Sequence, residues 1–147
     1  MKPYKQTAYD WAGTVLCNYC GNPAQITLGR YIWPHRTEMH DKRFFICVGC
    51  DAWVGTHEKT GKPFGTLANF ELRLWRHKAH RAFDPIWEAK VAAGIERHNA
   101  RNRGYKWLAR QLGINKDQCH IANMDIETCK RVVELCESME TLANESV

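Results

Sequence analysis

The chain has 147 residues, a formal net charge of +5 and 44% hydrophobic residues. This length suits one ordinary domain or two small ones, and the apolar content excludes an intrinsically disordered chain. Because no apolar run approaches the roughly 18 residues of a membrane span, we expect no membrane association. The N-terminus lacks the apolar core of a secretory signal, and seven cysteines, an odd number, argue against a disulfide framework. We therefore expect a protein of a reducing cytoplasm.

Two short cysteine motifs lie 26 residues apart in the first third of the chain. Cys17 and Cys20 form the first Cys-x-x-Cys knuckle, and Cys47 and Cys50 form the second. Two residues between thiols let one tight turn aim both sulfurs at one ion, and two such turns complete a tetrahedral Zn²⁺ shell. The sequence therefore predicts one structural zinc ion held by four thiolates, with no coordination position open for catalysis.

Runs of strand-forming residues surround both knuckles. Residues 24–28 alternate apolar and polar side chains, and residues 31–33 are rich in strand formers. Residues 43–46 lead into the second knuckle as a strand, and residues 51–54 leave it as another. Strands that enter and leave two knuckles are typical of a zinc ribbon, a small antiparallel sheet that depends on its metal.

The segment 60–65, with two glycines and one proline, is typical of a turn or linker. We therefore assign residues 1–62 to a zinc-ribbon module and residues 63–147 to a helical module, and we expect the two to pack together as one compact unit.

Helical periodicity dominates the second half of the chain. Thr66 is a candidate N-cap of a first helix that Asp84-Pro85 would close, and a second piece would run from Pro85 to about residue 94. A third apolar stripe covers residues 101–112 and ends at Gly113, and Asp125 caps a last helix. The predicted fold class is α+β, an N-terminal zinc ribbon packed against three or four C-terminal helices.

The charge is distributed unevenly along the chain. Residues 1–65 carry eight Lys/Arg and five Asp/Glu, residues 66–116 carry eleven and four, and residues 117–147 carry two and seven. A basic helical face can lie along the phosphates of DNA or RNA, whereas a solvated face, or one that pairs with the acidic last helix, is the alternative. The nucleic-acid-binding candidates are Arg73, Arg76, His77, His80, Arg81, Arg101, Arg103, Lys106 and Arg110.

Further metal ligands are less favoured. His57 follows the second knuckle by seven residues and is a candidate alternative ligand, or a partner of a ligand, but a histidine that holds a turn is the better interpretation where four thiolates are available. Cys119, Cys129 and Cys136, with His120, invite a second metal site. Because two of these cysteines lie seven residues apart on the apolar face of a helix, we interpret them as small hydrophobic residues.

A nuclease of the His-Asn-His type is the one enzyme considered. It would use His35 or His40, between the knuckles, as general base and His57 as metal ligand. However, no Asp-His pair lies between the knuckles, and no asparagine occurs in residues 24–68. We therefore expect no enzymatic activity.

Several stretches together resemble a known family: residues 31–36, which end the segment after the first knuckle, residues 50–57, which leave the second, and residues 65–69, which open the first helix. Over about residues 12–136 the chain resembles the small zinc-finger-containing domain found in bacteriophages and prophages. The resemblance implies a zinc site at Cys17, Cys20, Cys47 and Cys50 and a phage protein acting in the cytoplasm of its bacterial host, but no activity. The family often has a cysteine where this chain has Thr56.

The leading functional hypothesis is a phage-encoded structural-zinc protein that binds DNA or RNA through its basic helical face. The alternative is a host-takeover or anti-defence factor that binds a bacterial protein, with Trp33, Trp53 and Trp107 as aromatic anchors.

Overall fold

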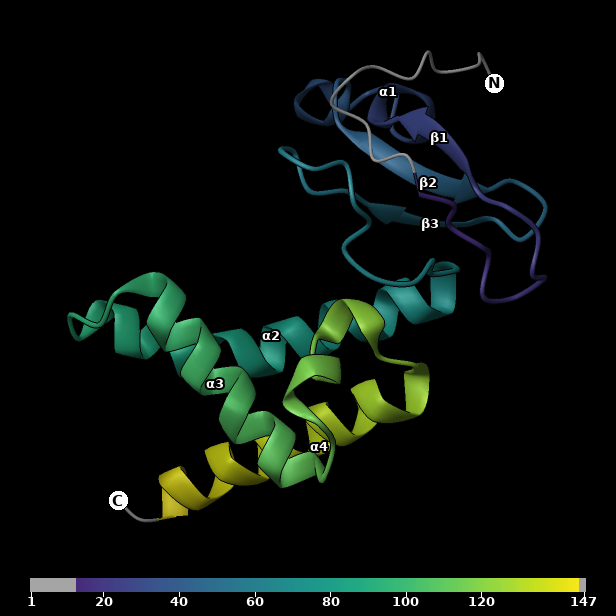
Figure 1. The fold of residues 1–147 in the computed structure, drawn as a ribbon. Coiled ribbons are helices and arrows are strands. Elements are labelled where there is room, and N and C mark those ends of the chain that lie inside the picture. Colours follow the sequence, from purple (N-terminus) through teal and green to yellow (C-terminus); the bar gives the residue numbers. More distant parts are fainter. Residues whose placement is uncertain (1–12, 146–147) are drawn as a thin grey trace. The chain divides into compact units, whose positions relative to one another are not determined.

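The computed structural model describes residues 13–145, and the chain divides into two compact units, Met1–Phe70 and Glu71–Val147. The first unit is built on a three-stranded antiparallel sheet of β1 (Gln25–Leu28), β2 (Arg43–Cys47) and β3 (Ala52–Gly55) in the order β1-β2-β3 (Figure 1). Phe45 of the central strand pairs with Ile26 on one side and Val54 on the other. The predicted small antiparallel sheet is therefore confirmed.

Both faces of the central strand β2 are buried. Because side chains alternate along a strand, Phe45 and Cys47 lie on one face, in a cluster with Cys17 and Leu67. Phe44 lies on the other face, where the ring of Trp33 meets it edge-on at a centroid distance of 5.2 Å. The sheet is thus covered by its own flanking segments on both sides.

Residues 31–33 do not form the predicted strand. The chain instead makes one turn of helix, α1 (Gly29–Ile32), which ends with the Trp33 N–H donating to the Gly29 carbonyl at 2.8 Å. A short 3₁₀ turn, η1 (Thr37–Met39), follows. A Cβ atom at Gly29 would overlap the Met39 carbonyl oxygen, so this close approach of the loop requires glycine. The packing of Trp33 on the sheet overrides the local preference for a strand.

The segment between β3 and the first long helix belongs to the first unit. The His57 N–H donates to the Lys62 carbonyl at 2.8 Å, and Trp53 and Ala68 exchange main-chain hydrogen bonds of 3.1 and 3.0 Å. Leu67 is fully buried in the core of this unit. The glycines of residues 60–65 therefore close a hairpin, and residues 63–70, which sequence assigned to the helical module, complete the ribbon.

The described residues of the second unit contain three long helices: α2 (Phe70–Ala92), which begins at the last residue of the first unit, α3 (Arg97–Leu112) and α4 (Ile126–Glu145). Two 3₁₀ turns, η2 (Lys116–Gln118) and η3 (Ile121–Asn123), connect α3 to α4. The apolar faces of the three helices and residues of the connection share one core, which includes Phe83, Trp87, Tyr105, Leu108, Ile121 and Val132. Within residues 13–145, no helix combines the length and the apolar character that crossing a membrane requires.

The prediction that a helix ends at Asp84 is wrong, because α2 continues through Pro85. A proline inside a helix removes one main-chain hydrogen bond. Phe83 and Trp87 flank it and are buried at 0% and 3% exposure, and Asp84 accepts a hydrogen bond of 3.0 Å from the Trp87 indole N–H. Packing on both sides of the proline therefore holds the helix together.

The predicted helix ends at Gly113 and Asp125 are confirmed. Gly113 is left-handed, with φ of 69°, and the N–H of Ile114 donates back to the Ala109 carbonyl at 3.1 Å. The carboxylate of Asp125 accepts from the N–H and the hydroxyl of Thr128 at 2.8 and 2.7 Å. These two ends depend on contacts within a few residues, which explains why sequence alone located them.

Candidate metal centre

The four knuckle cysteines converge in the first unit. Cys17 and Cys20 precede β1, Cys47 ends β2, and Cys50 lies in the turn before β3. Their sulfur atoms all lie within 4.8 Å of one another, and the Cys20 and Cys47 sulfurs are 3.7 Å apart. With Zn–S bonds of about 2.3 Å, a tetrahedral shell separates two sulfurs by about 3.8 Å. The cluster therefore fits one structural Zn²⁺ bound by four thiolates.

Each knuckle turns back through a left-handed residue placed directly after its second cysteine. Gly21 has φ of 79° and Asp51 has φ of 50°. The Gly21 N–H donates to the Cys17 carbonyl at 2.8 Å, and the Asp51 N–H donates to the Val48 carbonyl at 3.2 Å. Aspartate tolerates this conformation better than most residues. Sequence reasoning missed the role of Asp51, although its position matches that of the glycine in the first knuckle.

The thiols already influence one another's ionisation. Burial raises the pKa of the Cys17 thiol, but N–H groups of Cys20 and Tyr19 and the neighbouring thiols lower it more, so that this pKa falls to about 7. The Cys20 side chain and burial raise the pKa of Cys50 to about 12. Because one thiolate opposes the ionisation of the next, four thiols at this separation favour a divalent cation that binds all four as thiolates.

The zinc centre lies near the surface of its unit. Cys17 is 2% exposed and Cys47 is buried, whereas Cys50 is half-buried and Cys20 is exposed.

A model of the family described as a zinc-finger-containing domain matches residues 13–139. The chain belongs to this family. The matched residues of this zinc-finger-containing domain include both knuckles. No curated protein and no solved structure shows significant similarity to the chain.

His57 of the zinc-finger-containing domain lies in the hairpin after β3. Its ring meets the Phe64 ring edge-on at a centroid distance of 4.6 Å, and its N–H donates to the Lys62 carbonyl. Over the described part of the chain, the group of side chains able to hold a metal consists of the four cysteines. The contacts of His57 are those of a residue that holds a turn.

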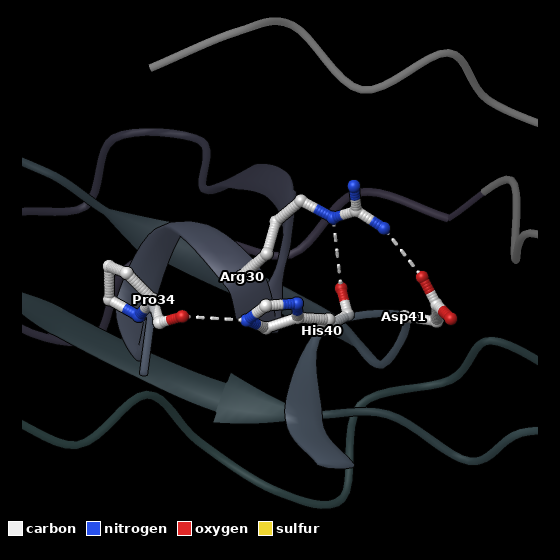
Figure 2. A network of polar contacts seen from close by, with 4 residues as sticks. All are labelled: Arg30, Pro34, His40 and Asp41. Carbon is white, nitrogen blue, oxygen red and sulfur yellow. Dashed lines mark hydrogen bonds and ion pairs between the residues drawn. The ribbon is translucent and has the colours of Figure 1, made fainter. Parts of the chain in front are cut away.

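His40 takes part in a local network that holds the loop after α1 (Figure 2). Its Nε2 lies 2.9 Å from the Pro34 carbonyl oxygen, and the Arg30 guanidinium donates to the His40 carbonyl at 3.4 Å and to the Asp41 carboxylate at 2.6 Å. One nitrogen of the His40 ring therefore faces the main chain.

The three later cysteines lie in the helical core. Cys119 and Cys129 are fully buried and Cys136 is 5% exposed. Burial raises the pKa of each of these thiols to about 11. Thiols that stay protonated in an apolar core contribute to packing as small hydrophobic side chains.

The basic candidates on α2 lie in several different environments. Arg76 is 8% exposed and donates from Nε to the Met124 carbonyl at 3.1 Å. His80 Nδ1 lies 3.1 Å from the Asp84 carboxylate, and Arg81 lines a groove that it shares with two glutamates of α4. Arg73 is half-buried and His77 is exposed. Helix α2 therefore does not present all of its cations on one open face.

The candidates on α3 are all exposed. The guanidinium of Arg101 lies over the Tyr105 ring, 5.0 Å from its centroid. Arg103, Lys106 and Arg110 follow an i, i+3, i+7 spacing and so share one face of α3. None of the ion pairs found between described residues includes any of these three.

Proposed function

We propose that this zinc-finger-containing domain binds nucleic acid through the outer face of α3. The observation that supports it is the stripe of Arg103, Lys106 and Arg110, three exposed cations on one helical face. Seven residues of α-helix extend about 10 Å, so the three groups form a short linear array. Each can neutralise one phosphate of a nucleic-acid strand.

The distribution of acidic residues further supports α3 over α2. Glu134 and Glu137 of α4 line the same groove as Lys78 and Arg81 of α2. Arg76 donates to a buried carbonyl and is left out of the proposed surface. The acidic last helix thus offsets cations of α2, and the stripe on α3 is the part of the basic segment best suited to phosphates.

The zinc ion has a structural role in this proposal, because four thiolates fill its shell. Action of a phage protein in the host cytoplasm is part of the same proposal, supported by the family resemblance alone. The alternative of a protein partner has less support, because its expected anchors are half-buried. Trp33 packs edge-on against Trp53 at 5.9 Å, and Trp107 packs against the helical core.

The test is a salt series of binding to labelled single- and double-stranded DNA and RNA, measured by fluorescence anisotropy. The logarithm of the affinity decreases with the logarithm of the salt concentration, and the magnitude of this negative slope falls by about 0.7–0.9 for each phosphate that the protein no longer neutralises. We expect the triple variant Arg103→Ala/Lys106→Ala/Arg110→Ala to reduce the magnitude of the slope by about 2 to 3 and to weaken binding at roughly 50 mM salt.

The matched control removes three exposed cations elsewhere, as Lys78→Ala/Lys90→Ala/Arg97→Ala. Both variants have the same net charge, so a general charge effect predicts the same decrease in each. The proposal requires the control to keep the parental slope. Equal slopes for the two variants, or no binding by the parent protein at about 50 mM salt, contradict it.

A further inference from the structure

A cavity of about 660 Å³ lies in the first unit, at the end of β2 opposite Cys47. One wall comes from residues between 37 and 44, and the other from residues between 55 and 64. Pockets that bind small molecules have volumes of about 300–1,000 Å³. The cavity is therefore large enough for one drug-sized ligand or one nucleotide.

Both walls are held in place by hydrogen bonds. Arg30 binds the Asp41 carboxylate and the His40 carbonyl, which anchors the first wall to α1 (Figure 2). On the second wall, the Phe64 N–H donates to the Gly55 carbonyl at 2.9 Å. Arg43 joins the two walls, since its Nη2 donates to the Glu58 carbonyl at 2.8 Å. The cavity is thus formed before any ligand arrives, which lowers the cost of binding.

An aromatic ring is held at the side of this cavity. Phe64 is 49% exposed, and the ring of His57 meets it edge-on. A Cβ atom at Gly55 would lie 3.0 Å from two carbons of the Phe64 ring, so the ring rests directly on the glycine backbone. A half-exposed ring with a fixed position is suited to stacking against a second planar ring.

Two of the carboxylates around the cavity are paired with arginines that do not line it. Asp41 pairs with Arg30 at 2.6 Å, and the Glu38 carboxylate pairs with Arg36 at 2.8 Å. The carboxylate of Glu58 and the ammonium of Lys42 are in no ion pair found within residues 13–139. One acceptor and one donor of opposite charge suit a neutral ligand that carries both hydrogen-bond donors and acceptors.

We propose that this cavity holds the base of an unpaired nucleotide. The base stacks on Phe64, donates an N–H to the Glu58 carboxylate and accepts a hydrogen bond from the Lys42 ammonium. The inference rests on the proposed binding of nucleic acid and narrows the ligand to a single strand, because the bases of a duplex are stacked and paired.

The test uses the full zinc-loaded chain and the nucleosides adenosine, guanosine, cytidine and uridine, which carry no phosphate. Binding is followed through the amide resonances of Gly55, Glu58 and Phe64. We expect at least one nucleoside to shift these resonances, and Phe64→Leu and Glu58→Gln each to weaken its binding about tenfold. The matched control is Phe70→Leu, which changes a phenylalanine that is 71% exposed in the same unit and should leave binding unchanged.

The possible failures of the two proposals are distinguishable. If no nucleoside at millimolar concentration shifts these amides while single-stranded oligonucleotides still bind through α3, the cavity inference is overturned and the α3 proposal stands. If nucleosides bind at the cavity but oligonucleotides of every kind fail to bind, the α3 proposal is overturned instead. Nucleoside binding that is equally weakened by Phe64→Leu and Phe70→Leu also contradicts the cavity inference.

Discussion

Removal of the zinc ion should unfold the first unit and leave the second unit folded. The strands of the sheet have only four, five and four residues, and the whole unit ends at Phe70. In a core of this size the gain from apolar burial and the loss of conformational entropy nearly cancel, so the net stability without a staple is close to zero. The four thiolates bind one ion that the unfolded chain cannot hold in the same geometry, so the binding free energy of zinc becomes folding free energy.

The size of the effect follows from the affinity of four-thiolate and related sites. The standard free energy of zinc binding to structural sites is about 10–16 kcal/mol at pH 7. At a free zinc concentration of 1 μM, about 8 kcal/mol of this is offset by the dilution of the ion from the 1 M standard state. The ion should therefore stabilise the unit by about 2–8 kcal/mol at 1 μM free zinc. Because one ion binds, each tenfold change in free zinc should change this stability by about 1.4 kcal/mol.

Amide hydrogen exchange in zinc-buffered solutions measures directly how much zinc stabilises the first unit. The amides of β2 should lose protection as free zinc falls, whereas amides in the middle of α3 should keep theirs. Cys47→Ser removes a buried ligand and should abolish stoichiometric zinc binding. Cys136→Ala changes a cysteine buried in the helical core, and that variant should still bind one zinc ion per chain. Protection of β2 that does not depend on zinc, or full zinc content in Cys47→Ser, refutes this reasoning.

Two further predictions concern the helical unit. Asp125→Ala should lower the free energy of unfolding by about 1 kcal/mol and Asp125→Asn by much less, because the cap accepts from Thr128. These Thr128 contacts lower the pKa of Asp125 in the folded protein. The stabilisation by the Asp125 carboxylate is therefore fully present above the pKa of an unperturbed aspartate, about 3.9, and is lost as the pH falls through the lower pKa of the folded state. Urea titrations at pH 7 and pH 2 measure this loss of stability. Gly104→Ala should destabilise by roughly 1 kcal/mol, because a Cβ atom would lie 3.1 Å from the Trp87 Cβ and overpacking exceeds the gain in helix propensity. The surface control is Gln111→Ala. If Gly104→Ala has a free energy of unfolding equal to or greater than that of the control, the overpacking argument is contradicted.

The features that sequence located correctly depend on residues close together along the chain. Two residues between cysteines are enough to form one knuckle, and the pairing of two knuckles follows from the four ligands that zinc needs. Helix α3 ends at Gly113 and helix α4 begins after Asp125, and both ends are fixed by hydrogen bonds between residues three to five positions apart. Such contacts depend little on the tertiary context, so local patterns located these two ends. The N-cap predicted at Thr66 is wrong, because α2 begins at Phe70 and Leu67 is buried in the core of the first unit.

The features that sequence located wrongly, or did not reveal, depend on distant residues. Residues 31–33 do not form the predicted strand, because Trp33 packs on Phe44. Helix α2 continues through Pro85, because Phe83 and Trp87 are buried in the helical core. Arg76, a plausible phosphate ligand by spacing alone, is buried against a carbonyl 48 residues later. The cavity beside Phe64 likewise depends on two segments that are separate in the sequence, residues 37–44 and residues 55–64, and that line it together. Burial is set by the packing of distant segments, which no local spacing records, so the metal centre could be predicted from the sequence whereas the candidate binding surfaces required the fold.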